Sequence, residues 1–221
     1  MAKLSDYYTL LEPGYYFHIY NRSVNGGDLF VDRGNYDFFL RRYDSYLSDF
    51  VETYAFCLLK NHFHLLIRVR EWAAILTTFE SKLATGIDLT TFQKLSNLGP
   101  NSPHSDVISH QFQKFFQSYA MAFNKQQGRY GTLFQTPFKR SRIDTDAYLT
   151  QVIYYIHANP QKHGIIQDFR TYEWSSYHRI IESRPSKLCK ADVLNWFGGE
   201  EPYLRYHEEK QDFDSREWVI E

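Results

Sequence analysis

The sequence has few cysteines, no long apolar run and no apolar stretch at its N-terminus, and each absence excludes a class of protein. Two of its 221 residues are cysteine, and Cys57 and the distant Cys189 give neither a zinc-ligand spacing nor a disulfide framework. We therefore expect a reducing compartment, the cytoplasm. No apolar run approaches the roughly 18 residues of a membrane span, and the opening residues differ from a signal peptide. We expect no membrane partner.

An excess of either charge is also absent from the composition. Hydrophobic residues make up 43% and charged residues 23%, which excludes disordered, collagen-like and coiled-coil classes. The length suits one sizeable domain with or without an appendage. A formal net charge of −1 beside 18% aromatic residues argues, at first sight, against an overtly basic nucleic-acid-binding protein.

The near-neutral charge is the sum of two unlike parts of the chain. Residues 198–221 contain eight acids and three bases, so residues 1–197 carry a net charge of +4. Residues 107–143 contain six bases and no acid, and aromatic residues lie between these bases. Such a stretch suits a nucleic-acid strand, with cations at phosphates and rings at bases. For three of these rings that follow helical spacing, Phe115, Tyr119 and Phe123, we expect a place in the core instead.

Hydrophobic periodicity predicts an α+β fold, an antiparallel sheet with helices packed on one side of it. We expect a domain of residues 1–180, with residues 71–109 a short helix and a loop-rich connection, and a C-terminal extension of residues 181–221 with an acidic tail. The expected strands are residues 15–20, 53–59, 62–69 and 132–142, the last broken at Pro137, and the expected helices are residues 35–50, 110–125, 146–158 (ending before Pro160) and 191–197.

A His-x-His pair lies in one of the predicted strands. Because side chains alternate along a strand, His62 and His64 project from one face and Phe63 from the other. Two adjacent imidazoles can bind one divalent metal. The same spacing also arises by chance, so the pattern alone leaves a structural role open.

The helix predicted for residues 146–158 brings two polar side chains together. Tyr155 and Asn159, four residues apart, are neighbours on the flank of this helix. The alternative for Tyr155 is a boundary tyrosine with a packed ring and a solvated hydroxyl, and for Asn159 a residue that only ends the helix. The buried face of the helix is expected to consist of Leu149, Val152, Ile153 and Ile156.

These two groups of residues suggest one chemistry. Two histidines and an amide oxygen can hold a divalent metal and leave positions for water and phosphate oxygens. A phenol, with an ordinary pKa of about 10, is a poor nucleophile, and a metal on the scissile phosphate would stabilise the developing charge. The tyrosine would then attack phosphorus and hold the strand as a phosphotyrosine ester.

Four motifs occur in the order found in a known family. Together they resemble the single-tyrosine HUH transposases, and most closely the branch of REP-associated tyrosine transposases. The likeness runs from about Tyr15 to Tyr177, and Leu59-Lys60 departs from the Met-Pro of many relatives at a point outside the ligands. The motifs are Asn61-His62-Phe63-His64, Gly131-Thr132-Leu133-Phe134-Gln135, Tyr155-Ile156-His157-Ala158-Asn159-Pro160 and Trp174-Ser175-Ser176-Tyr177.

The resemblance implies a ferredoxin-like or RRM-like sheet, the HUH endonuclease fold, that cleaves and rejoins single-stranded DNA at REP-like or insertion-end hairpins. It implies Mg²⁺ or Mn²⁺ as cofactor, bound by His62 and His64 and, as third ligand, by Asn159, where relatives often have glutamine. It implies that Tyr155 is the nucleophile, leaving a 5′-phosphotyrosine and a free 3′-hydroxyl. DNA-contact candidates, for which surface solubilisation is the alternative, are Arg22, Lys139, Arg140 and Arg142.

The sequence leaves the number of subunits and two rival functions open. Relatives work as monomers or as homodimers that exchange the tyrosine helix, and the short connection between Arg142 and Asp146 favours packing within one chain. One rival is a metal-dependent phosphodiesterase in which metal-bound water attacks and Tyr155 is only structural. The other is a non-catalytic module that binds single-stranded nucleic acid on an aromatic sheet.

Overall fold

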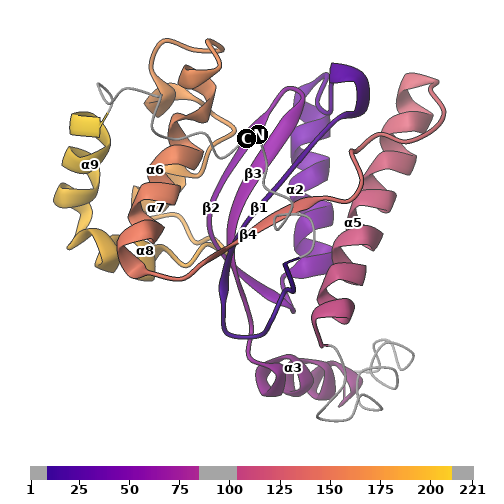
Figure 1. Ribbon diagram of the computed structural model, residues 1–221, viewed down its shortest axis with the longest axis horizontal. Coiled ribbons are helices and arrows are strands. Elements are labelled where there is room, and N and C mark those ends of the chain that lie inside the picture. Colours follow the sequence, from indigo (N-terminus) through magenta and orange to yellow (C-terminus); the bar gives the residue numbers. More distant parts are fainter. Residues whose placement is uncertain (1–8, 85–103, 211–221) are drawn as a thin grey trace.

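The computed structural model describes residues 9–84 and 104–210. They form three layers, with a four-stranded antiparallel sheet between two layers of helices (Figure 1). The strands lie in the order β2-β3-β1-β4. Helices α2 and α5 cover one face, and α6 with α8 and α9 covers the other. The strands are β1 (Tyr16–Arg22), β2 (Val51–Leu59), β3 (His62–Val69) and β4 (Lys139–Ile143). The helices are α2 (Arg33–Leu47), α3 (Trp72–Ala84), α5 (His104–Gln127), α6 (Asp146–Lys162), α7 (Tyr177–Ile181), α8 (Lys190–Phe197) and α9 (Glu200–Glu209).

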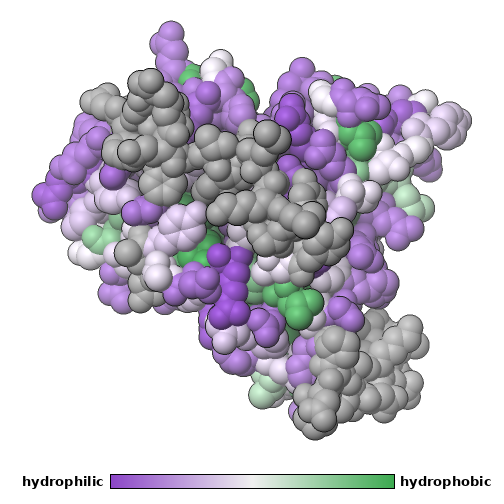
Figure 2. Space-filling view, viewed as in Figure 1, coloured by the Kyte–Doolittle hydropathy of each residue, from purple (hydrophilic) through white to green (hydrophobic). Residues whose placement is uncertain are grey.

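The predicted α+β class and antiparallel sheet are confirmed, but the prediction that helices lie on one side is wrong. Neighbouring residues of the central strands are apolar on both faces, as Leu65 and Leu66 illustrate in β3. Both faces must therefore be covered to remove this surface from water. Figure 2 shows only small, scattered hydrophobic patches among hydrophilic residues on the face it displays.

The pairing of β1 with β3 organises the sheet. Phe17 pairs with Ile67 and Ile19 with Leu65, and these four side chains enter the core beneath α2 and α5. The rings predicted at helical spacing join them, because Phe115, Tyr119 and Phe123 are all buried. Because side chains alternate along a strand, the residues that lie between these four strand residues in β1 and β3 face α6.

Several element boundaries differ from prediction, and two of the differences have a local cause. Helix α2 begins at Arg33 rather than residue 35, because Asp32 caps it by accepting a hydrogen bond from the Asn35 amide at 3.0 Å. Helix α5 begins at His104 rather than residue 110. The strand expected over residues 132–142 is confined to β4, because residues before it hydrogen-bond the end of β1 instead, with the Gln135 amide donating to the Arg22 carbonyl at 2.8 Å.

Helix α6 does not end before Pro160 as predicted but continues to Lys162. A proline inside a helix costs about 3 kcal/mol because it removes one hydrogen bond and its ring meets the preceding turn. Packing offsets this cost, since the helix is buried from Tyr155 to Pro160. Its expected apolar face is confirmed, with Leu149, Val152, Ile153 and Ile156 all buried.

Part of the loop-rich connection expected over residues 71–109, residues 85–103, lies outside the described residues, as does the end of the acidic tail after residue 210. Residues 72–84 of that connection form α3. No helix of the two described ranges has the length and apolar character needed to cross a membrane. Both cysteines are free thiols.

The C-terminal helices are attached to α6 through a buried chain of hydrogen bonds. The His207 Nδ1–H donates to the Tyr203 carbonyl at 2.8 Å, which leaves His207 Nε2 to accept from His157 Nδ1 at 3.0 Å. The His157 Nε2 then accepts from the Ser176 hydroxyl at 2.8 Å. Gly198 and Gly199, with φ of +86° and +122°, make the tight turn between α8 and α9. This turn brings α9, which carries His207, back against α6.

Both imidazoles of this chain are neutral because they are buried. Burial lowers the pKa of His207 to about 4. Burial, and then the neighbouring His207, lowers the pKa of His157 well below its ordinary value. A proton on either ring would break the donor-acceptor order that joins α6 to α9.

The pH dependence of folding tests this neutral pair. The unfolded chain binds a proton at position 207 near pH 6.5 and the folded chain only near pH 4, so stability is full above pH 6.5 and falls as the pH drops between them. His207 alone should lower the free energy of unfolding by about 3 kcal/mol across this window. Urea denaturation across the same pH range measures the loss. The variant His207→Gln should lose markedly less, and an identical loss would contradict the assignment.

Candidate active site on the α6 face of the sheet

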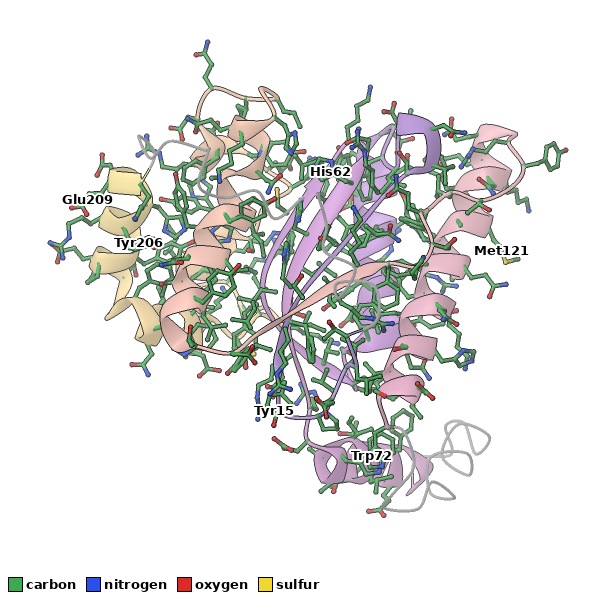
Figure 3. All side chains as sticks on the ribbon, in the orientation of Figure 1. Tyr15, His62, Trp72, Met121, Tyr206 and Glu209 are labelled. Atoms are coloured by element: carbon green, nitrogen blue, oxygen red, sulfur yellow. The ribbon has the colours of Figure 1, made fainter. Side chains whose placement is uncertain are left out.

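The two histidines of the His-x-His pair lie on the face of β3 that is covered by α6. Figure 3 places His62 at the end of the sheet farthest from Trp72. His64 and His62 are paired across the sheet with Tyr20 and Arg22 of β1. The ring centroids of His62 and His64 are 5.2 Å apart, with the rings nearly perpendicular. The predicted shared face is therefore observed.

Strand β1 adds a third imidazole to this face. The His18 Nε2 atom lies 3.0 Å from His64 Nδ1, in a buried hydrogen bond. His18, Tyr20 and His64 form a stack of nearly parallel rings, with centroid distances of 4.9 Å from His18 to Tyr20 and 5.1 Å from His18 to His64. The stack and the hydrogen bond together fix the orientation of His64.

Helix α6 brings Tyr155 over this stack. Its ring meets His64 edge-on with centroids 5.5 Å apart, and it meets His18 in the same way at 5.8 Å. Tyr155 is 5% exposed and Asn159 1% exposed, so both side chains lie in the buried layer between α6 and the sheet. Asn159 does not end the helix, because α6 continues to Lys162. The Asn159 amide donates to the Tyr155 carbonyl at 3.3 Å, which keeps its side chain beside the tyrosine.

The two candidate metal-binding histidines are oriented by different partners. The His62 Nδ1–H donates to the Asn61 side-chain oxygen at 2.7 Å, which leaves Nε2 as the acceptor nitrogen of a neutral ring. The ring of His163, which follows the end of α6, lies 4.8 Å from that of His62. The hydrogen bond to the His62 ring gives Asn61 a structural role in the motif.

The electrostatics of the site favour neutral histidine beside a cation. Burial, followed by the nearby His18 and His62, lowers the pKa of His64 well below its ordinary value. His64 is therefore an uncharged ring with a lone pair near neutral pH. The Lys162 ammonium lies 4.7 Å from the centroid of the Tyr155 ring, and burial lowers the pKa of Lys162. Positive charge at this position stabilises a phenolate relative to a phenol.

The donor atoms suit a divalent cation only when the amide is included. Within residues 9–84 and 104–210, no group of three histidine, cysteine, aspartate or glutamate side chains is arranged to hold a metal. Two buried acceptors nevertheless lack a hydrogen-bond partner among these residues, His64 Nε2 and Asn159 Oδ1. Such atoms are costly unless something binds them. Two imidazoles and an amide oxygen form a set that fits a cation with further positions open.

The four basic DNA-contact candidates do not form one surface. Arg22 and Lys139 belong to the α6 face, and the Lys139 ammonium lies 5.1 Å from the centre of the Tyr20 ring. Alternation along β4 turns Arg140 and Arg142 to the opposite face. Arg142 is also engaged by acids, with Glu12 at 3.0 Å and Asp144 at 2.8 Å.

Sequence reasoning missed His18 and Lys162. The alternation of Tyr16, His18 and Tyr20 gave a signal that these three share a face, but only the β1–β3 register shows that this face is the one with His64. Lys162 lies beyond residue 158, where the helix is predicted to end. Continued through Pro160, the helix puts Lys162 two turns after Tyr155 and on the same side.

The chain is similar to REP-associated tyrosine transposases in sequence and in structure, although no family model matches it. A Haemophilus influenzae protein assigned to the REP-associated tyrosine transposases is 24% identical over 160 residues, which is 64% of this chain and 77% of that protein. A solved structure of a REP-associated tyrosine transposase bound to a REP hairpin superposes with a TM-score of 0.56 and 15% identity, covering 82% of this chain and 86% of that one.

The resemblance to REP-associated tyrosine transposases is confirmed by both relatives. The predicted fold is confirmed as well, because the chain forms an antiparallel sheet with helices packed on it and superposes on the solved transposase.

The hydrogen bond between His18 and His64 can be tested through stability. Changing His18→Leu leaves His64 Nδ1 buried without its partner, which should lower the free energy of unfolding by about 1–3 kcal/mol. Urea denaturation at neutral pH measures this change. The variant His18→Gln, which restores a polar partner, should recover part of the loss. Equal stability of the leucine variant and the parent would contradict the importance of this contact.

Proposed function

We propose that this chain is a DNA transposase that cleaves and rejoins hairpin-flanked single-stranded DNA with Tyr155 as its nucleophile. The observation that supports this proposal most is the position of the Tyr155 ring, edge-on to His64 at 5.5 Å within one buried cluster of polar groups. A structural tyrosine needs no such surroundings. The similarity to REP-associated tyrosine transposases supports the same reaction class.

The proposed reaction conserves phosphodiester bonds. The Tyr155 oxygen attacks phosphorus, a P–O bond to Tyr155 forms, and the bond from phosphorus to the 3′-oxygen breaks. The phenol loses one proton and the departing 3′-oxygen gains one, so protons balance. The products are a 5′-phosphotyrosine and a strand that ends in a 3′-hydroxyl. Rejoining is the reverse attack by a 3′-hydroxyl. The Lys162 ammonium, 4.7 Å from the ring centroid, stabilises the phenolate as both attacking and leaving group.

The proposed cofactor is Mg²⁺ or Mn²⁺, held by His62, His64 and Asn159. A divalent cation at this place would supply Lewis-acid stabilisation of the phosphate oxygens. Asn61 and His18 orient the two imidazoles, and a proton on His64 Nδ1, donated to His18, leaves Nε2 with a lone pair for the metal. The unsatisfied Asn159 Oδ1 supports its place as third ligand.

The proposed partner is single-stranded DNA with a REP-like or insertion-end hairpin. The solved relative was bound to a REP hairpin, which supports this class of substrate. Arg22 and Lys139, on the same face as Tyr155, are the DNA contacts that the proposal favours for the cleaved strand. We propose that the protein acts in the cytoplasm as a monomer or homodimer. In the structure, α6 packs on the sheet of its own chain.

Replacing Tyr155 tests the covalent step. Wild-type protein incubated with labelled hairpin DNA and Mn²⁺ should give a protein-DNA adduct that survives denaturing electrophoresis, and Tyr155→Phe should give none, because the attacking oxygen is gone. The variant Tyr148→Phe on the same helix is the matched control and should keep the adduct. Cleavage by Tyr155→Phe would instead indicate attack by water. Absence of cleavage and of an adduct in the wild type would favour the binding module.

Metal binding can be measured without activity. Changing His64→Ala removes one ligand, and the affinity for Mn²⁺ should fall at least about tenfold. Electron paramagnetic resonance of free Mn²⁺ in a titration reports this affinity. The exposed His110 is the control, and His110→Ala should bind Mn²⁺ as the parent does. Equal affinity of the parent and the His64 variant would remove the metal from the mechanism.

A further inference from the structure

A cleft of about 580 Å³ lies between α5 and the segment that leads into β4, on the face of the sheet opposite Tyr155. Its volume is typical of a ligand pocket. Apolar side chains, three of them aromatic, make its floor, and all of them belong to the core that α5 shares with the sheet. The apolar floor consists of Phe116, Leu133, Phe134 and Phe138.

Side-chain amides surround this apolar floor. Gln113 and Gln117 lie four residues apart on α5 and are both exposed, so they are neighbours at one side of the cleft. Gln135 borders the cleft from the other side. None of these three amides hydrogen-bonds another residue of the described part of the chain. Each can therefore offer a donor and an acceptor side by side to a ligand.

The charge around the cleft favours an anionic occupant. Residues that line it include no acid, and residues 107–143, which supply nearly all of them, contain none. The Arg140 guanidinium borders the cleft, 4.8 Å from the centre of the Phe138 ring, and donates to the Ser109 hydroxyl at 2.6 Å. A phosphate that reaches the cleft therefore meets a cation on a fixed support.

The cleft is connected to the Tyr155 face around an edge of the sheet. Strand β4 is the edge strand, and its successive residues Lys139 and Arg140 face opposite sides, towards Tyr20 and the cleft. On β1, Asn21 lines the cleft, whereas Arg22 beside it pairs with His62. One extended strand can thus pass from the proposed active site to the cleft with a cation at each face.

We propose that this cleft is a base-reading pocket for the single-stranded DNA that the protein cuts. A nucleotide of the strand turns around the edge of β4, its base packs on Phe116 and Phe134, and an amide of Gln113 or Gln117 hydrogen-bonds the base edge. The side-by-side donor and acceptor of glutamine match the N6 and N7 groups of adenine, so adenine is the preferred base. This inference rests on the proposed function for the identity of its ligand.

Binding of short oligo-dA, oligo-dT and oligo-dC strands tests the pocket. The Tyr155→Phe protein in chelator excludes cleavage, and fluorescence anisotropy gives each affinity. We expect oligo-dA to bind about tenfold more tightly than oligo-dT, the discrimination of one bidentate contact. The double change Gln113→Ala and Gln117→Ala should weaken oligo-dA alone and remove the preference. The control Gln127→Ala, at the exposed end of α5 outside the cleft, should keep it.

Other outcomes decide against the pocket or against the proposed function separately. An unchanged preference in the double variant, no preference in the parent, or equal weakening of all three strands would overturn base reading at this cleft. A retained and cleft-dependent preference in a protein whose wild type forms no covalent adduct would leave the pocket standing and would remove the transposase reaction. An adduct without cleft-dependent preference would do the opposite.

Discussion

The register between β1 and β3 is the constraint on which the site depends. It pairs Tyr20 with His64, and side chains alternate along both strands, so His18 and the His-x-His pair come to one face. A slip of one residue would turn His18 into the core beneath α5 and bring Phe17 to the site. The apolar residues between the histidines prevent that slip, because burying them on the α5 side fixes the pairing. The same packing therefore stabilises the fold and assembles the imidazoles.

Helix α6 carries the nucleophile candidate, and it is held from two sides. Its apolar face packs on β2 and β3, while His157 on its other side is bonded to His207 of α9. Contacts on both sides explain how the helix continues through Pro160 and keeps Lys162 near Tyr155. The C-terminal helices thus contribute to the position of the helix that carries Tyr155.

Patterns with a short period predicted most of the site, and long-range pairing determined the rest. A period of two placed His62 with His64, and the helical period placed Tyr155 with Asn159. His18 was out of reach because its partner is 46 residues away and the register is a property of the folded sheet. The prediction that α6 ends before Pro160 used only local propensity. The cost of the internal proline is offset by tertiary burial of the helix, which the local sequence does not show.

The basic side chains of residues 107–143 are distributed in a way that the linear sequence does not show. The absence of acids from residues 107–143 suggests one basic surface, but Lys139 and Arg140 lie on opposite faces of the sheet because side chains alternate along β4. Arg142 is then neutralised by Glu12 and Asp144, which lie outside the stretch. Positive charge is therefore divided between two faces at one edge strand. That division favours a ligand that can bend around an edge, as a single strand of nucleic acid does, over a rigid duplex lying on one face.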